Sequence, residues 1–203
     1  DSVAGDIGVG AAKTGMLGAA PTVHAVVEAL TRWRIRPLVV DPVAVSSTGA
    51  ALVDPAGLAA LRVALVPLAD LLTPNLAEAA ALTGSGPIGD RSAMEAVARD
   101  LLRLGAGAVL VKGGHLDGPD APDLLATSEG GWTWLEGPRV PGRHNHGTGC
   151  VLSAAVTARL ARGEELGAAV EAAKDFVARA IRVGVELGAG VGAVNPAGPA
   201  TDA

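Results

Sequence analysis

The sequence predicts an α/β fold in which a doubly wound, mostly parallel sheet is flanked by helices. Two observations predict this class. Short apolar runs of strand length alternate with longer segments whose apolar residues recur at helical spacing. Several of the short runs are apolar throughout, as in parallel strands buried on both faces. One domain is expected, because no repeat, low-complexity tract or linker interrupts the alternation.

Each expected strand ends in glycine, proline or polar residues. The run RPLVVDPV, for example, is β-branched in its middle and stops at an Asp-Pro pair. A strand, a Gly-Gly turn and a second strand predict a short antiparallel hairpin around 123–140. The other strands are expected within 8–17, 36–43, 70–75 and 108–115.

The expected helices carry start and stop signals. Pro21 suits a first helical turn, and Asp54 precedes a proline as an N-cap. Gly84 and Gly105 close two helices at their C-termini. Helices are expected at 21–35, 54–69, 75–84, 90–105, 148–162 and about 165–186.

Composition limits the classes of function. The 203 residues are 49% hydrophobic and 18% charged, with a formal net charge of −5 and no basic stripe, so nucleic acid is not expected as a partner. No apolar run reaches the roughly 18 residues of a membrane span, so no membrane partner is expected either. The single cysteine, Cys150, cannot form an internal disulfide, and no signal peptide is visible. A cytoplasmic enzyme is therefore expected.

Polar residues that are unusual for a core follow four of the expected strands. In a sheet of this type, ligands bind beyond the carboxyl ends of the strands. A binding site is therefore expected where these ends meet. Its candidate residues are Lys13-Thr14-Gly15-Met16, Asp41-Pro42, Thr73-Pro74-Asn75 and Lys112-Gly113-Gly114-His115.

The stretch RHNHGTGCVLSAAV holds the only cysteine at the start of an expected helix. The first amides of a helix lack internal acceptors, and the helix dipole there favours negative charge. Gly147, Thr148 and Gly149 are therefore a candidate anion site for a phosphate or an oxyanion, and the same field favours a thiolate at Cys150. Alternatively, Cys150 is a small buried hydrophobe and the glycines only form a turn.

Two carboxylates are candidates for a magnesium site. Asp41 ends a buried strand, and Asn75 and Glu78 share the first turn of a helix. Mg²⁺ keeps several waters and uses one or two carboxylates together with substrate phosphates. The alternative is a capping box, in which Asn75 is the N-cap and Glu78 completes it. Both interpretations can hold together.

Two lysines are candidates for contact with anionic groups. Lys112 follows a buried strand and precedes two glycines, which suits a point charge against a nucleotide phosphate. Alternatively, it only extends its charged end to solvent along an apolar stem. Lys13, beside Thr14 and Gly15, shows a weaker form of the same pattern.

Together these motifs resemble the hydroxymethylpyrimidine/phosphomethylpyrimidine kinases of thiamine biosynthesis, within the ribokinase-like superfamily. The resemblance covers residues 1 to about 190. It implies a small-molecule pyrimidine substrate, ATP and Mg²⁺, and a homodimer. It rests on KTGML (13–17), VVDPV (39–43), LLTPNLAEAAALTG (71–84), VLVKGGH (109–115) and HGTGCVLSAAV (146–156).

The resemblance also implies roles for individual residues. Cys150 would take the proton of the acceptor hydroxyl, and Gly147, Thr148 and Gly149 would form the anion hole for the transferring phosphoryl group. Asp41 and Glu78 would organise Mg²⁺. The nucleotide would contact Thr73, Asn75, Lys112 and Gly114, and the pyrimidine would contact Lys13, Gly15 and Met16.

Three hypotheses follow for the function. The first is the phosphorylation of hydroxymethylpyrimidine and of its monophosphate. The second is a pyridoxal kinase of the same fold, in which the cysteine variant also occurs. The third is a non-catalytic ligand-binding remnant, because the chain begins with DSVAGDIGVGAAKTGML, which is typical of the middle of a fold. An N-terminal segment that supplies part of the pyrimidine pocket is therefore expected to be absent.

Overall fold

A computed structural model describes residues 1–46, 49–141, 146–184 and 190–198 of the chain. Within these residues one six-stranded sheet has the order β1-β2-β3-β4-β5-β6. The first four strands are parallel, and β5 and β6 continue the sheet as the expected antiparallel hairpin. The strands are β1 (Ala12–Thr14), β2 (Leu38–Val40), β3 (Leu71–Leu72), β4 (Ala108–Lys112), β5 (Asp123–Thr127) and β6 (Trp132–Leu135).

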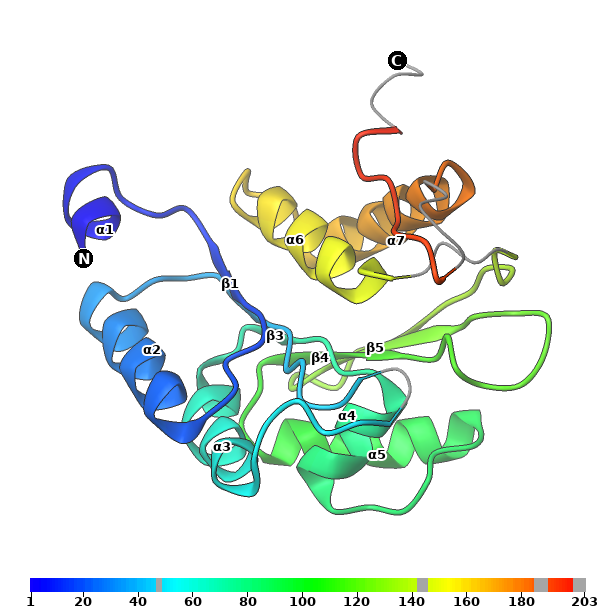
Figure 1. The fold of residues 1–203 in the computed structure, drawn as a ribbon, viewed down its shortest axis with the longest axis horizontal. Coiled ribbons are helices and arrows are strands. Elements are labelled where there is room, and N and C mark those ends of the chain that lie inside the picture. The colour runs from blue at the N-terminus through cyan, green and yellow to red at the C-terminus, as the bar shows by residue number, and fades with distance from the viewer. Residues whose placement is uncertain (47–48, 142–145, 185–189, 199–203) are drawn as a thin grey trace.

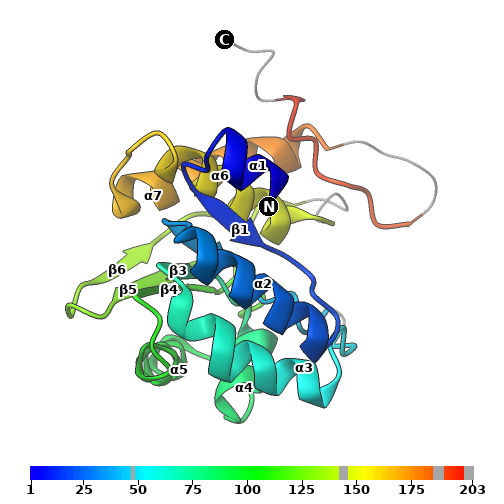
Figure 2. The same ribbon diagram turned by 90° about the vertical axis from the view of Figure 1, so that its left-hand side faces the viewer.

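Helices cover both faces of the sheet, which confirms the α/β class (Figures 1 and 2). One face packs against α2 (Ala20–Trp33), α3 (Pro55–Ala60), α4 (Leu76–Thr83) and α5 (Arg91–Arg103). The opposite face packs against α6 (Thr148–Leu160) and α7 (Leu166–Arg182). The strand order does not reverse, so the described helices that connect the parallel strands all lie on one face, and α6 and α7 pack on the other.

The helix expected over 54–69 is not continuous. Asp54 caps α3 as expected, with its carboxylate accepting a hydrogen bond from the Gly57 amide. The chain then passes through a π-helical turn, Leu61–Leu65, and a 3₁₀ turn, Val66–Leu68. Pro67 lies in the last turn, and a proline ring has no N–H to continue an α-helix. Pro67 therefore gives a local reason why the α-helix does not continue to residue 69.

Two other elements differ from the sequence prediction. A short helix, α1 (Ser2–Asp6), occupies a segment for which no helix was expected, and its Val3 and the following Ile7 are exposed. The last helix ends at Arg182 rather than near 186, and residues 185–189 lie outside the described part of the chain. Among the described helices, none is both long and apolar enough to cross a membrane.

The alternation of side chains along the strands places several polar residues on the α6–α7 face. Val39 and Leu71 belong to the core beneath α6 and α7, so Asp41 and Thr73, two residues further on, project from the same face. Leu110 belongs to the same core, and Lys112 follows it by two residues. The carboxyl ends of β2, β3 and β4 therefore bring a carboxylate, a hydroxyl and an ammonium group under α6.

Candidate active site

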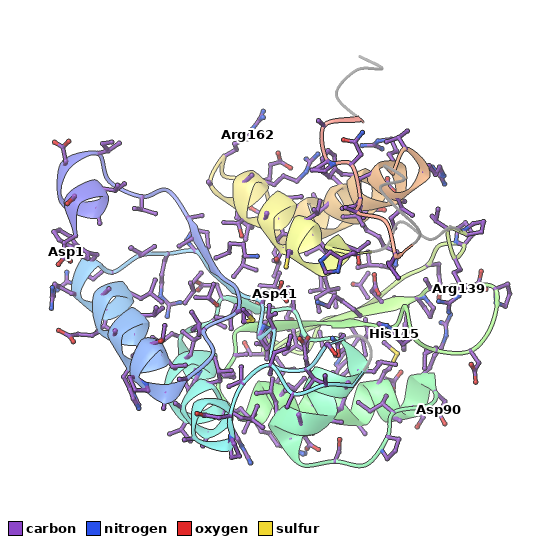
Figure 3. All side chains as sticks on the ribbon, in the orientation of Figure 1. Asp1, Asp41, Asp90, His115, Arg139 and Arg162 are labelled. Atoms are coloured by element: carbon purple, nitrogen blue, oxygen red, sulfur yellow. The ribbon has the colours of Figure 1, made fainter. Side chains whose placement is uncertain are left out.

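Asp41 is the centre of the candidate site, and only 2% of the residue is exposed. Figure 3 shows it in the middle of the molecule, below α6. Its Oδ1 atom lies 3.4 Å from Lys112 Nζ and 3.4 Å from Thr73 Oγ1. Its Oδ2 atom lies 3.0 Å from Ser153 Oγ and 3.8 Å from Lys13 Nζ. One buried carboxylate thus has two lysines and two hydroxyl groups around it.

The first turn of α6 lies against this cluster. A Cβ atom on Gly149 would stand 3.1 Å from Lys112 Nζ, so the ammonium group packs against the glycine backbone. The first amides of a helix attract anions, and so does an ammonium group. Lys112 and the start of α6 therefore form a candidate phosphate site, as the sequence predicted for Gly147, Thr148 and Gly149.

The turn that leads into α6 is held by the C-terminal tail. Gly147 has a φ of 87°, in the left-handed region that favours glycine. The backbone of His146 accepts a hydrogen bond from the Val194 amide and donates one to the Gly192 carbonyl, each at 3.2 Å. Nothing in the local sequence indicated that the tail supports this turn. Residues 142–145, which precede it, lie outside the described residues.

Cys150 lies in the first turn of α6, and its residue is exposed. It is therefore not the buried hydrophobe of the alternative interpretation. It lines an apolar pocket together with residues of α6 and α7, among them Val151, Ala154 and Phe176. The thiol is accessible, but among the described residues none of the Asp41 cluster lines this pocket, and the role of Cys150 as a base stays a prediction.

The capping box at the start of α4 is present. The Asn75 side chain accepts a hydrogen bond from the Glu78 amide at 2.9 Å, and Glu78 Oε2 accepts one from the Asn75 amide at 2.8 Å. Only 3% of Glu78 is exposed, and burial raises the pKa of its carboxyl group. Lys112 and the amides of Asn75 and Ala44 lower that pKa, whereas the charge of Asp41 raises it further.

The carboxylates of Asp41 and Glu78 could hold a magnesium ion only together with the phosphates of a bound substrate. Within the described ranges, no group of three or more His, Cys, Asp or Glu side chains could hold a metal. Mg²⁺ does not need such a group, because it uses one or two carboxylates together with waters and phosphates. The buried Glu78 carboxylate would repel a phosphate placed near Lys112, and a divalent cation between them would offset that repulsion.

The structure brings only some of the residues predicted to contact the pyrimidine to the Asp41 cluster. Lys13 reaches the Asp41 cluster, and a Cβ atom on Gly15 would lie 4.0 Å from the Lys13 ammonium group. Met16, by contrast, is 63% exposed. A role for Gly15 and Met16 in a pyrimidine pocket stays a prediction.

The first residue of β5, Asp123, is a second buried aspartate, which sequence reasoning missed. Asp123 Oδ1 accepts a hydrogen bond from the Gly113 amide at 2.9 Å, and Lys174 Nζ lies 2.6 Å from its Oδ2. A Cβ atom on Gly113 would stand 2.0 Å from the Pro122 carbonyl oxygen, so only glycine fits there. Gly114, in contrast, has open space around it.

Ser153 is the other site residue that the sequence did not indicate. It is fully buried in α6, and its hydroxyl group touches both Lys13 and Asp41. A serine in a helix usually bonds to its own backbone. Its position one turn after Cys150 in the expected helix was the one available signal.

Comparison with known proteins supports the family resemblance. Residues 1–195 match the family model described as phosphomethylpyrimidine kinase. The chain is 46% identical over 194 residues to the hydroxymethylpyrimidine/phosphomethylpyrimidine kinase of Streptomyces coelicolor, covering 96% of this chain and 71% of that protein.

Solved structures of two kinases are similar to this one. The pyridoxal kinase of Staphylococcus aureus in complex with AMP-PCP and pyridoxal has a TM-score of 0.89 and 34% identity, over 98% of this chain and 71% of that one. The phosphomethylpyrimidine kinase of Clostridium difficile has a TM-score of 0.77 and 36% identity, over 89% and 72%. The extent of the family match and the 46% identity with a named member lead to one conclusion: the chain belongs to the phosphomethylpyrimidine kinase family.

Proposed function

We propose that this protein transfers a phosphoryl group from ATP to hydroxymethylpyrimidine and then to its monophosphate, as a step of thiamine biosynthesis. The observation that carries the proposal is the Asp41 cluster, in which two lysines meet under α6 and one of them, Lys112, lies against its first turn. The names of curated relatives that are 40–46% identical to this chain supply the substrate class.

The proposed reaction needs little covalent chemistry from the protein. The acceptor hydroxyl oxygen attacks the terminal phosphorus of ATP, its proton passes to the thiolate of Cys150, which becomes a thiol, and ADP leaves. Lys112 and the amides of Gly147 to Gly149 stabilise the charge on the transferring group. Mg²⁺, when bound with ATP, would neutralise phosphate charge, and Asp41 and Glu78 would hold it. Thr73, Asn75 and Gly114 would border the nucleotide.

Steady-state kinetics test the proposal. The chain is incubated with ATP, Mg²⁺ and either hydroxymethylpyrimidine or its monophosphate, and ADP release is coupled to NADH oxidation. ADP release that depends on each acceptor is expected. Release no faster than without acceptor would contradict the proposal, and AMP-PCP binding without turnover would then favour a non-catalytic ligand-binding protein.

A pyridoxal kinase is the second candidate. The specific observation in its favour is the TM-score of 0.89 with the Staphylococcus aureus pyridoxal kinase. The identity with that protein, 34%, is lower than the 46% with the Streptomyces coelicolor relative. A comparison of kcat/KM for pyridoxal and for hydroxymethylpyrimidine decides between the candidates, and a preference for pyridoxal would reverse the ranking.

We also propose that the enzyme is cytoplasmic, as the single cysteine and the lack of a visible signal peptide favour, and that it forms a homodimer, as the resemblance implies. Cell fractionation tests the first of these proposals, and light scattering of the eluting protein tests the second. A membrane-bound fraction or a monomer mass would overturn the respective proposal.

A further inference from the structure

We propose that Ser153 is a positioning residue that fixes the Lys13 ammonium group and the Asp41 carboxylate relative to the first turn of α6. The inference rests on the proposed kinase function, because that turn carries Cys150 and the candidate phosphate site. No contact with a substrate is assigned to Ser153 itself.

The hydroxyl group of Ser153 is the closest polar neighbour that Lys13 and Asp41 share. Lys13 Nζ donates to Ser153 Oγ at 2.8 Å, and Ser153 Oγ lies 3.0 Å from Asp41 Oδ2. The direct distance between Lys13 Nζ and Asp41 Oδ2 is 3.8 Å, which is too long for a hydrogen bond. The two charged groups are therefore linked mainly through the serine.

The position of Ser153 also connects the charges to the helix. Its hydroxyl lies 3.1 Å from the Cys150 carbonyl oxygen, so its single proton can go to that oxygen or to Asp41. Lys13 belongs to β1, Asp41 follows β2, and Ser153 belongs to α6. One fully buried hydroxyl group thus joins two strands to the helix that begins at the candidate phosphate site.

A neighbouring residue shows what an ordinary hydroxyl does in this helix. Thr157, one turn further along α6, donates to the Ser153 carbonyl at 2.7 Å. Within the described residues, its hydroxyl makes no hydrogen bond to a strand. The bond to Ser153 is the usual back-bond of a threonine in a helix. Ser153 makes the same kind of contact and adds two to charged groups, so a comparison of the two positions separates positioning from helix stability.

Kinetics form the first part of the test. Ser153→Ala is expected to lower kcat about 10- to 100-fold, because small displacements of reacting groups have effects of that size. The KM for ATP is expected to change much less. Thr157→Ala is expected to keep kcat within about twofold, since only a back-bond is lost. Thermal melting of both variants measures their stability. A kcat for Ser153→Ala within twofold of the wild type would overturn the proposal.

A double-mutant cycle with Lys13→Met tests whether Ser153 acts through Lys13. If it does, Ser153→Ala has a smaller effect on kcat in the Lys13→Met background than in the wild type. Effects that simply multiply would contradict the proposal, because a purely structural role does not depend on Lys13.

A third measurement does not depend on kinase activity. The chain has only three lysines, Lys13, Lys112 and Lys174, so the rate of reductive methylation at each can be followed by mass spectrometry. Lys13 is expected to react faster in Ser153→Ala than in the wild type or in Thr157→Ala, while Lys174 keeps its rate. If the wild type proves inactive as a kinase, the proposed function fails, and this labelling still decides the role of Ser153. An unchanged Lys13 rate would reject it.

Discussion

Asp41 and Asp123 are two buried aspartates under the same pair of helices, and both have lysine partners. Asp123 pairs with one lysine, Lys174, at 2.6 Å, and its other oxygen accepts the Gly113 amide. Lys174 also donates to the Ala121 carbonyl at 2.7 Å. Charges and hydrogen bonds are matched one to one, which is what a buried ion pair needs to be stable.

The surroundings of Asp41 are different. Two lysines approach its carboxylate, at 3.4 Å and 3.8 Å, and neither distance is that of a short ion-paired hydrogen bond. The two lysines therefore carry more positive charge than the single carboxylate can neutralise, and Lys112 lies beside the start of α6. Asp123 thus holds the Gly113 amide in the turn after β4, whereas the Asp41 cluster is the candidate site for an anionic ligand. Lys112→Met and Lys174→Met test the two sides of this contrast, and Cys150→Ala and Glu78→Gln test groups near the Asp41 cluster.

Cys150→Ala is expected to have the largest effect. Loss of a general base lowers kcat by about 10²- to 10⁴-fold. ATP affinity should stay close to that of the wild type, because the thiol is not assigned to nucleotide binding. Initial rates and calorimetric titration with AMP-PCP measure the two quantities. An unchanged kcat would show that the thiol is not the base.

Lys112→Met tests the binding side of the comparison. Removal of one donor that stabilises a transferring group costs about 10²- to 10³-fold in kcat. The variant is also expected to lose AMP-PCP affinity while it keeps most of its stability, because Asp41 retains Lys13, Ser153 and Thr73 as neighbours. A variant that unfolds but binds AMP-PCP normally when folded would reverse the assignment.

Lys174→Met tests whether the pair of Asp123 and Lys174 stabilises the fold. Removal of one partner from a buried pair leaves an uncompensated charge, at a cost of about 3 kcal/mol. The folded enzyme is expected to keep kcat within about tenfold, because the hydrogen bonds of Lys174 go to Ala121 and Asp123, outside the Asp41 cluster. Urea unfolding measures the first quantity and initial rates the second. The double variant Lys174→Met/Asp123→Asn is the control, and it should recover part of the lost stability, since the unpaired carboxylate is gone.

Glu78→Gln has the smallest expected effect, and it depends on pH. Burial raises the pKa of Glu78 above 4.5, so the folded state binds this proton more tightly than the unfolded state. The resulting stability is fully present below pH 4.5 and is lost as the pH rises through the folded pKa. Without ligands, Glu78→Gln should therefore become more stable relative to the wild type as the pH approaches neutrality.

Glu136→Gln is the matched control for that measurement. A hydrogen bond from Arg91 lowers the pKa of the exposed Glu136 carboxyl group. Its contribution to stability therefore has the opposite sign: it is present above the unfolded pKa and is lost as the pH falls. Urea unfolding of both variants between pH 4 and 8 should show the two opposite trends. A difference between Glu78→Gln and wild type that does not change with pH would contradict the assigned burial effect.

Local patterns in the sequence predicted most of the fold. The runs that end at Asp41, Thr73 and Lys112 are strands, and the capping box of Asn75 and Glu78 is present. These predictions succeed because strand alternation and helix caps depend on residues a few positions apart. The helix over 54–69 was the main local error, and Pro67 was the available signal against it.

The site was only partly predictable, because its contacts join residues that lie far apart in the sequence. Lys13 and Ser153 are 140 positions apart, and no local pattern relates them. Ser153 has the sequence context of an ordinary helical serine, and Lys174 that of a surface lysine on an amphipathic helix. The contact of Gly192 and Val194 with His146 likewise depends on where the tail returns.

The order of strands and helices and the polar groups at the strand ends could be read from the sequence, because they follow from neighbours along the chain. Which face of the sheet carries Asp41 and Lys112 under α6, and which lysine meets which aspartate, depend on the tertiary fold. Sheet register and the packing of α6 and α7 set those distances. Those distances distinguish the close pair of Asp123 and Lys174 from the looser Asp41 cluster at the start of α6.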